Sequence, residues 1–168
     1  YYSMMSYLFR ANYSYNNKYI ATVTFRRDGS SKFTSENRFS NFPSVAFGWN
    51  IGNESFMQSL EWISKLKLRA SWGIIGNEKI SYFDRYARVQ SSIIAVLGNP
   101  DSPVPAATYG KSGNPDLKWE STTQTDIGAE VGLLANRLTG EFDFYNRVTN
   151  DILVELSTPG HLGNGQGQ

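Results

Sequence analysis

The sequence contains no cysteine and a single histidine among its 168 residues. The absence of cysteine excludes disulfides, thiolate metal sites and a cysteine nucleophile. A histidine-based metal cluster or a Ser-His-Asp triad would have to rest on His161 alone, which lies in a Gly-rich tail. The sequence therefore predicts no catalytic centre, no metal site and no cofactor, and the protein is not expected to be an enzyme.

A strong net charge and a long hydrophobic run are missing as well. The formal net charge is +1, whereas nucleic-acid binding calls for an excess of basic residues. No stretch approaches the roughly 18 to 20 apolar residues of a transmembrane helix. Aromatic residues, in contrast, make up 14% of the chain, with 10 Tyr, 10 Phe and 4 Trp. Because such side chains suit a pleated surface, the composition favours an all-β fold.

Apolar and polar residues alternate along six segments, which predicts strands that each have one apolar face. The clearest segment is "MSYLFRANYSY", in which every second residue from Met5 to Tyr15 is apolar or aromatic. The predicted strands cover approximately residues 5–15, 19–25, 45–51, 66–74, 119–133 and 138–145.

Two of the connecting regions have patterns of their own. Between residues 52 and 65, Phe56, Leu60 and Ile63 recur at helical spacing behind Asn53, a possible N-cap, which predicts a short helix. The region 75–118 contains four prolines and several glycines, which argue against a continuous strand, so we expect an irregular loop with local pairing at most near residues 82–89.

The connections alternate between short and long, which is typical of an outer-membrane β-barrel. Short or medium turns at 16–18, 52–65 and 134–137 alternate with long loops at 26–41 and 75–118. The predicted strands, of about 8 to 14 residues, match the roughly 9 to 11 residues that cross a bilayer at a tilt. The predicted helix would then lie on the periplasmic side and the long loops outside the cell. A soluble carbohydrate-binding β-sandwich has the same alternation and stays open as the alternative.

The charged residues of the strands favour the barrel, because they lie on the non-apolar faces, where a wet lumen would hold them. The predicted lumen-facing residues are Arg10, Arg69, Glu120, Asp126, Glu130, Glu141 and Asp143. Glu141 and Asp143 could imitate a glycosidase pair, but two carboxylates on one strand face fit a polar wall better. Aromatic residues near the strand ends predict membrane girdles, with Tyr13, Tyr15, Tyr19, Trp49, Trp72 and Trp119 as candidates.

Two loop motifs imitate binding sites. "RRDG", from Arg26 to Gly29, predicts an outward loop with an Asp-Gly turn and arginines that pair with acidic neighbours, rather than a phosphate site. "YGKSGNP" resembles the end of a phosphate-binding loop, but Pro105 stands where the earlier glycine is needed. Loop aromatics could stack on sugar rings or pack the loop. The candidate loop or substrate contacts are Arg26, Arg27, Tyr82, Tyr86 and Tyr109.

Four blocks of the chain, in order, resemble one family. They are "RANYSYNNKYIATVTFRRDGSSKF", "NFPSVAFGWNIGNESFM", "LKLRASWGIIGN" and "NPDLKWESTTQTDIGAEVGLLANRLTGEFDFYNRVTNDIL". Together they resemble the SusC/RagA family of TonB-linked transporters in the outer membrane of Bacteroidetes. The resemblance implies an antiparallel transmembrane barrel of about 22 strands with a plugged lumen. It also implies contact with outer-membrane lipids, a SusD-like surface lipoprotein and TonB as partners, and an oligosaccharide or peptide as cargo.

Neither a plug nor a TonB box is found in these residues, and six strands cannot close such a barrel. We therefore expect residues 1–168 to be an internal part of a TonB-dependent receptor β-barrel domain. The plug domain, through which TonB would act, and the remaining strands would lie outside it.

Overall fold

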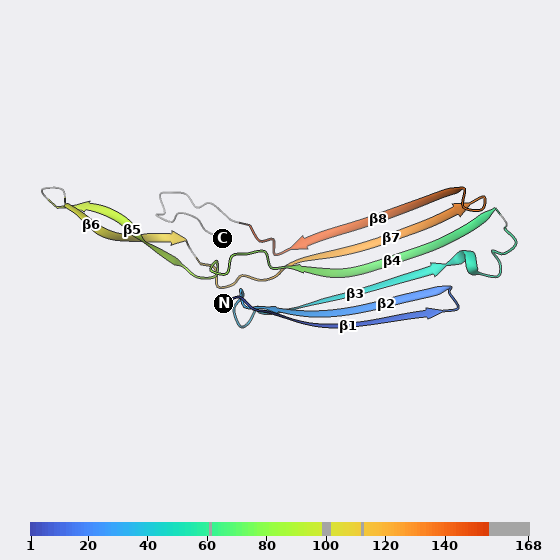
Figure 1. Cartoon of the computed structure of the whole chain (residues 1–168), viewed down its shortest axis with the longest axis horizontal. Coiled ribbons are helices and arrows are strands. Elements are labelled where there is room, and N and C mark those ends of the chain that lie inside the picture. The colour runs from blue at the N-terminus through green and yellow to red at the C-terminus, as the bar shows by residue number, and fades with distance from the viewer. Residues whose placement is uncertain (61, 99–101, 112, 155–168) are drawn as a thin grey trace.

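Six long strands form one antiparallel sheet in a computed structural model that describes residues 1–60, 62–98, 102–111 and 113–154 (Figure 1). The strands follow the order β1-β2-β3-β4-β7-β8. Their bounds are β1 Met4–Tyr15, β2 Tyr19–Ser30, β3 Phe39–Asn50, β4 Ile63–Asn77, β7 Glu120–Leu133 and β8 Leu138–Asn150. The expected all-β, antiparallel arrangement of six long strands is confirmed.

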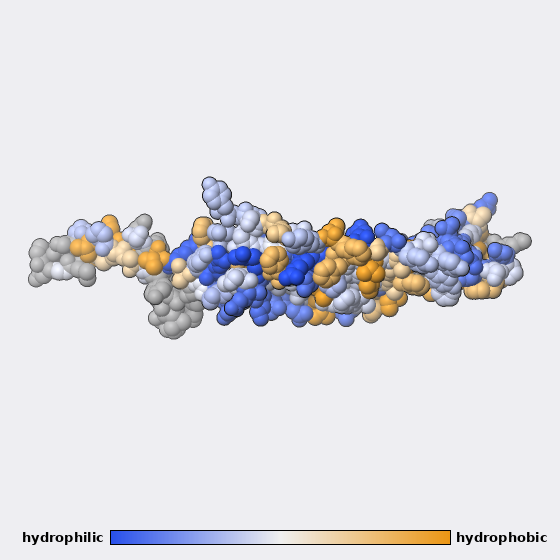
Figure 2. All heavy atoms as spheres, turned by 90° about the horizontal axis from the view of Figure 1, so that it is seen from below, coloured by the Kyte–Doolittle hydropathy of each residue, from blue (hydrophilic) through white to orange (hydrophobic). Residues whose placement is uncertain are grey.

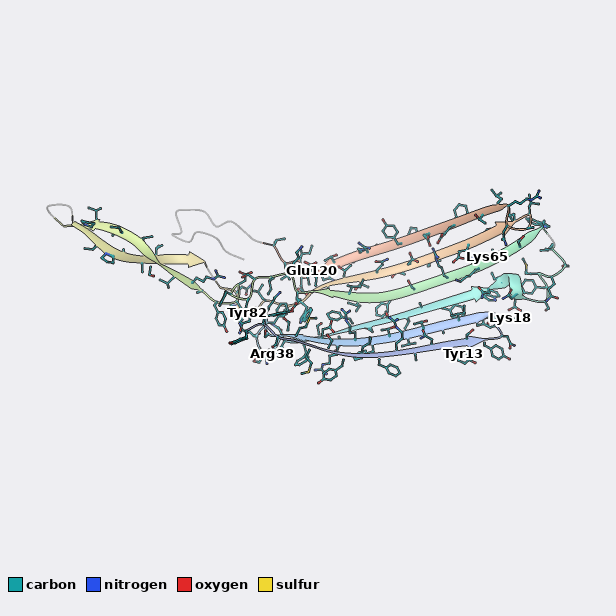
Figure 3. The ribbon with its side chains drawn as sticks, viewed as in Figure 1. Tyr13, Lys18, Arg38, Lys65, Tyr82 and Glu120 are labelled. Atoms are coloured by element: carbon teal, nitrogen blue, oxygen red, sulfur yellow. The ribbon has the colours of Figure 1, made fainter. Side chains whose placement is uncertain are left out.

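The sheet has a short-turn end and a long-loop end. At the short-turn end, Asn16 and Asn17 take φ values of 49° and 52°, a left-handed conformation that asparagine tolerates better than most residues. The turn between β7 and β8 lies at the same end, and the loops 31–38 and 78–119 lie at the other. Figure 3 shows this polarity, with Tyr13, Lys18 and Lys65 near one end and Arg38, Tyr82 and Glu120 near the other.

The loop predicted for residues 26–41 is shorter than expected, because β2 continues to Ser30. Asp28 pairs with Ser40 and Gly29 with Phe39 in the β2–β3 ladder, so the predicted Asp-Gly turn is wrong. A Cβ atom on Gly29 would come within 2.7 Å of Cδ1 of Phe39. The glycine thus makes room for the Phe39 ring on a strand rather than bending the chain.

The helix predicted between residues 52 and 65 is not found. A single 3-10 turn, η1 (Ile51–Asn53), is followed by turns in which the N–H groups of Met57 and Leu60 bond to the carbonyl oxygens three residues earlier, both at 3.0 Å. The side chain of Asn53 donates to the Asn17 carbonyl oxygen at 2.9 Å instead of capping a helix. Phe56 is 60% exposed, so its spacing does not mark a buried helix face.

The region predicted to be irregular contains a second, two-stranded sheet that projects beyond the long-loop end (Figure 1). It pairs β5 (Arg88–Leu97) with β6 (Ser102–Lys111). Pro103 and Pro105 lie on β6. Each strand of this ribbon has one free edge, where a missing proline N–H removes no ladder bond. Proline therefore did not exclude a strand here. No helix in the described part of the chain is long and apolar enough to cross a membrane.

A small core closes the long-loop end. The Trp119 ring lies 5.2 Å from the Phe33 ring and 5.5 Å from the Phe42 ring, centroid to centroid. Its Nε1 donates to the Arg38 carbonyl oxygen at 3.1 Å, and Leu117 completes the cluster. Trp119 is only 5% exposed, so its predicted place in a membrane girdle is wrong. It precedes β7, where the loops fold over it.

At the short-turn end, Glu54 joins the β3–β4 loop to the first turn. Its carboxylate accepts hydrogen bonds from Lys18 Nζ at 2.9 Å, the Tyr19 hydroxyl at 2.8 Å and Trp49 Nε1 at 3.2 Å. The Tyr19 and Trp49 rings stack at 6.1 Å. The hydrogen bonds, that from Lys18 first, hold the pKa of Glu54 below its usual range, and the same bond raises the pKa of Lys18.

The Trp119 cluster generates the first prediction. Trp119→Ala should loosen the long-loop end, because truncating a buried tryptophan costs about 3 kcal/mol or more, roughly a hundredfold in a local opening equilibrium. Protease cleavage within residues 78–118 of the folded full-length protein measures this opening. Trp62→Ala is the matched control, since Trp62 is 55% exposed. Equal cleavage rates for the two variants would show that Trp119 does not anchor the loop.

The Glu54 contacts generate a prediction on pH. Because the folded pKa of Glu54 is lowered, its stabilising contribution is present above the unfolded pKa of about 4.3 and is lost as the pH falls through the folded pKa. The raised pKa of Lys18 means that its contribution persists below about pH 10.4 and is lost as the pH rises through its folded pKa. The difference in urea midpoint between wild type and Glu54→Gln should be constant in between and shrink at both extremes. A difference that does not vary with pH contradicts the assignment.

Candidate functional site

The ladder register sorts the side chains of the large sheet onto two faces. The face that carries Phe9, which we call the apolar face, also carries its cross-strand partner Phe25. The register of the other ladders places Val45, Leu68 and Phe144 on this same side. Much of it is open, with Phe144 74% exposed. Figure 2, seen from the β1 side, shows hydrophobic side chains gathered along the middle of the sheet. In the described residues no second sheet packs on this face, as it would within a β-sandwich.

Four aromatic girdle candidates lie together on the apolar face at the short-turn end. Tyr15, Tyr19 and Trp49 are cross-strand neighbours, and Tyr13 is two residues from Tyr15 along β1. Trp72 lies on the same face further along the sheet, between Val45 and Thr125. Their contact with a membrane stays a prediction, but Tyr13, Tyr15 and Tyr19 are exposed on one face at one end of the sheet, as a girdle requires, whereas Trp49 is half-buried.

The opposite face, which we call the polar face, carries every residue predicted to face a lumen. The register places them on this one side of β1, β4, β7 and β8: Arg10, Arg69, Glu120, Asp126, Glu130, Glu141 and Asp143. Arg10 bonds to Thr24, and Glu120 accepts a bond from Asn77 at the long-loop end. The lumen itself remains a prediction.

Arg69 is the centre of an ion-pair network on this face that spans three strands. From β4, its guanidinium reaches Glu130 on β7 at 3.2 Å and Asp143 on β8 at 2.7 Å, and it also pairs with Glu141. Lys65 and Lys67 add further pairs to Glu130 at 2.6 and 3.5 Å. Three cations thus face three carboxylates. The two carboxylates that could imitate a glycosidase pair are both bound to Arg69.

Gly128 makes this network possible. It lies on β7 between Arg69 and Asp143 in register. A Cβ atom at this position would lie 2.6 Å from Arg69 Nε and would also meet Asp143, so the guanidinium can cross β7 only over a glycine. Sequence reasoning missed Gly128, Lys65 and Lys67. Lys67 lies two residues before Arg69 on the same alternating segment, so its face was predictable, whereas its partner was not.

The polar face is hollowed towards the long-loop end. A groove of about 510 Å³ runs over β1 to β7, with Arg10, Arg26, Phe42, Ile75 and Gln124 among its lining residues. Arg26 is bound to the buried Asp28, Nε to Oδ2 at 2.8 Å, which confirms the pairing expected for one of the two arginines. Both arginines lie on β2, on opposite faces, and not in a loop.

The loop aromatics belong to the support of the long-loop end. Tyr82 is half-buried, and its ring meets Phe83 edge-on at 5.2 Å. Arg85 lies 4.5 Å over the Tyr86 ring, and its Nη1 donates to the Phe33 carbonyl oxygen at 2.8 Å. Tyr86 is exposed and therefore remains available for contact. The side chain of Tyr109, on β6, and all of His161 lie outside the described residues. No group of three or more potential metal ligands occurs in the described ranges.

The Gly128 geometry can be tested against a second glycine. Gly128→Ala should displace Arg69 and lower the stability of the folded protein by about 1 to 3 kcal/mol, the usual cost of overpacking. Gly48→Ala is the matched control, because Gly48 is the neighbour of Arg69 on β3, yet its nearest contact would be 3.7 Å away. The temperature at which the full-length protein loses its folded band on unheated gels measures both. Equal shifts would contradict the proposed role of the glycine.

Comparison with known proteins agrees with this geometry. Residues 2–166 match the family described as "TonB dependent receptor-like, beta-barrel". The chain is 41% identical over 160 residues to TonB-dependent receptor P3 of Formosa agariphila, covering 95% of this chain and 16% of that protein. It is 39% identical over 163 residues to the TonB-dependent receptor SusC of Bacteroides thetaiotaomicron, covering 94% of this chain and 16% of that protein.

Solved structures show the same arrangement. A structure of the RagAB peptide transporter superimposes with a TM-score of 0.83 at 33% identity, over 98% of this chain and 18% of that chain. The same importer in its closed-closed state gives a TM-score of 0.84. The chain thus spans less than a fifth of the length of these relatives. The antiparallel strands, their two faces and the match over residues 2–166 agree, and the chain belongs to the TonB-dependent receptor β-barrel family, as a homologue of SusC and of RagAB-like receptors.

Proposed function

We propose that this chain forms part of the wall of an outer-membrane TonB-dependent importer, a barrel of about 22 strands. The importer would carry oligosaccharides or peptides with a SusD-like surface lipoprotein and would be driven through TonB. The observation that carries the proposal is the sheet itself, with an open apolar face on one side and a charged network on the other. An apolar face towards lipid and a polar face towards a wet interior are the features of the wall of an outer-membrane barrel.

The lengths of the strands also support a sheet that crosses a bilayer. The six strands contain between 12 and 15 residues, more than the roughly 9 to 11 that cross a hydrocarbon core at a tilt. The Arg69 network would line the wet interior. The short turns would face the periplasm, and the loops around Trp119 and Tyr86 would face outward, where cargo and the lipoprotein approach. There Tyr86 is a candidate contact, as is Arg26, which lines the groove on the polar face, whereas Arg27 lies on the opposite, apolar face.

The relatives suggest two alternative classes of cargo, peptides and oligosaccharides. RagAB is a peptide transporter by its description, and SusC-type systems are the basis for expecting oligosaccharides. The exposed Tyr86 ring beside Arg85 and Arg88 offers a surface for a sugar ring or for a peptide. Both cargo classes therefore enter the test.

The test of this function uses the full-length protein in its own host. The protein should fractionate with the outer membrane and run as a heat-modifiable band. A strain that lacks the gene should lose uptake of either a labelled oligosaccharide or a labelled peptide mixture, and the intact gene should restore it. A tonB-defective strain is the control, in which the intact gene should restore nothing. Recovery of the protein in the soluble periplasmic fraction would overturn the proposal.

A further inference from the structure

Arg27 is the one charged residue on the apolar face, counted over the described residues of the six strands. In register it lies between Tyr7 on β1 and Asn41 on β3. Its neighbour Arg26 points to the polar face and is neutralised by Asp28. For Arg27, in contrast, the ion pairs found among the described residues include none. An unpaired cation thus stands at the edge of an otherwise uncharged surface.

The neighbours of Arg27 hold it in place and leave it free to bind. Its guanidinium lies 5.2 Å over the Phe39 ring, a cation–π contact that orients the group without using its N–H donors. Tyr7 and Asn41 flank it at the roughly 5 Å spacing of cross-strand neighbours, and they add a hydroxyl and an amide. Arg27, Tyr7 and Asn41 are all exposed. Together they present several donors and one positive charge, which is the chemistry of a phosphate site.

A shallow depression follows on the same face, closer to the short-turn end. It has a volume of about 420 Å³ and an almost wholly apolar lining. Its lining residues include Ala21 and Ala70, which have small side chains, and the larger Val23, Phe47 and Trp72. Val23 is four residues from Arg27 along β2, about 13 Å at the usual rise of a strand. A phosphate at Arg27 and an apolar chain in the depression are therefore close enough to belong to one molecule.

We propose that Arg27, Tyr7 and Asn41 bind the phosphate headgroup of an anionic membrane lipid, one of whose acyl chains lies in the depression over Ala21 and Ala70. The inference rests on the proposed function, which turns the apolar face towards the bilayer and the long-loop end outward. Arg27 then lies at the level of the outer headgroups. A cation there, with hydrocarbon contacts below it, selects an anionic lipid over an uncharged one.

The test titrates the purified full-length protein, in neutral detergent, with phosphatidylglycerol and with an uncharged diacylglycerol that has the same chains. Native mass spectrometry counts the bound lipid. Wild type should bind phosphatidylglycerol about tenfold more tightly than Arg27→Gln, as expected for loss of charge-assisted hydrogen bonds. Arg10→Gln is the matched control, an exposed strand arginine on the polar face, and it should bind like wild type. Equal binding by wild type and Arg27→Gln overturns the site.

Two further arms distinguish a bound lipid from a free anion at Arg27. Ala70→Phe should fill the depression and weaken lipid binding severalfold, while Val148→Phe, on β8 on the same face outside the depression, should not. Inorganic phosphate at millimolar concentration should not displace phosphatidylglycerol; complete displacement would identify a free-anion site and contradict the lipid assignment. Outer-membrane fractionation of Arg27→Gln is measured in parallel. Its normal localisation without lipid retention leaves the importer intact, whereas a wild-type protein outside the outer membrane refutes the importer itself.

Discussion

The continuous antiparallel ladder from β1 to β8 is the constraint on which the other features depend. Because side chains alternate with a period of two, a slip of one residue in any pair would transfer a whole strand to the other face. The register from Phe9 through Phe25 to Pro43, and from Ala70 through Ile127 to Phe144, has no such slip between the two faces. A single layer of strands can therefore present apolar groups to one medium and charged groups to another, without a second layer to cover either side.

The Arg69 network shows how such a wall tolerates charge. Ion pairs buried in a dry core often cost more free energy in desolvation than they return. The Arg69 side chain, in contrast, is about a third exposed, and two of its three carboxylate partners, Glu141 and Asp143, are exposed at least as much. The Arg69 guanidinium is therefore stabilised both by its carboxylate partners and by water. The network joins β4, β7 and β8 by side chains in addition to the backbone ladder. Gly128 is the structural requirement, because any side chain there would occupy the path of the guanidinium.

The alternating strands, their faces and the clustering of charges on one face could be predicted from the sequence, since all three follow from a period of two. The exact pairs could not, because register depends on strand ends. The predicted Asp-Gly turn was wrong because Gly29 lies on a strand and makes room for the Phe39 ring. The helix predicted between residues 52 and 65 was wrong because the Asn53 side chain donates to the Asn17 carbonyl oxygen in the first turn instead of capping a helix. Trp119 looked like a girdle residue because burial by a distant loop segment around Phe33 leaves no local signal. Strand β6 was not predicted because Pro103 and Pro105 argued against a strand, whereas a strand with a free edge tolerates proline.

The adjacent residues Arg26 and Arg27 show the effect of side-chain alternation most directly. In the sequence they look equivalent, as a basic pair before Asp28. Because β2 extends to Ser30, side-chain alternation places Arg26 on the polar face, where it pairs with the buried carboxylate of Asp28. It places Arg27 on the apolar face, where its guanidinium lies over the Phe39 ring beside neutral hydrogen-bonding groups. An arginine can remain at that edge because its guanidinium is weakly hydrated and packs on aromatic rings. The difference between the two residues is thus set by strand geometry alone, and it is the reason that Arg26 is paired within the sheet while Arg27 keeps its charge on the apolar face.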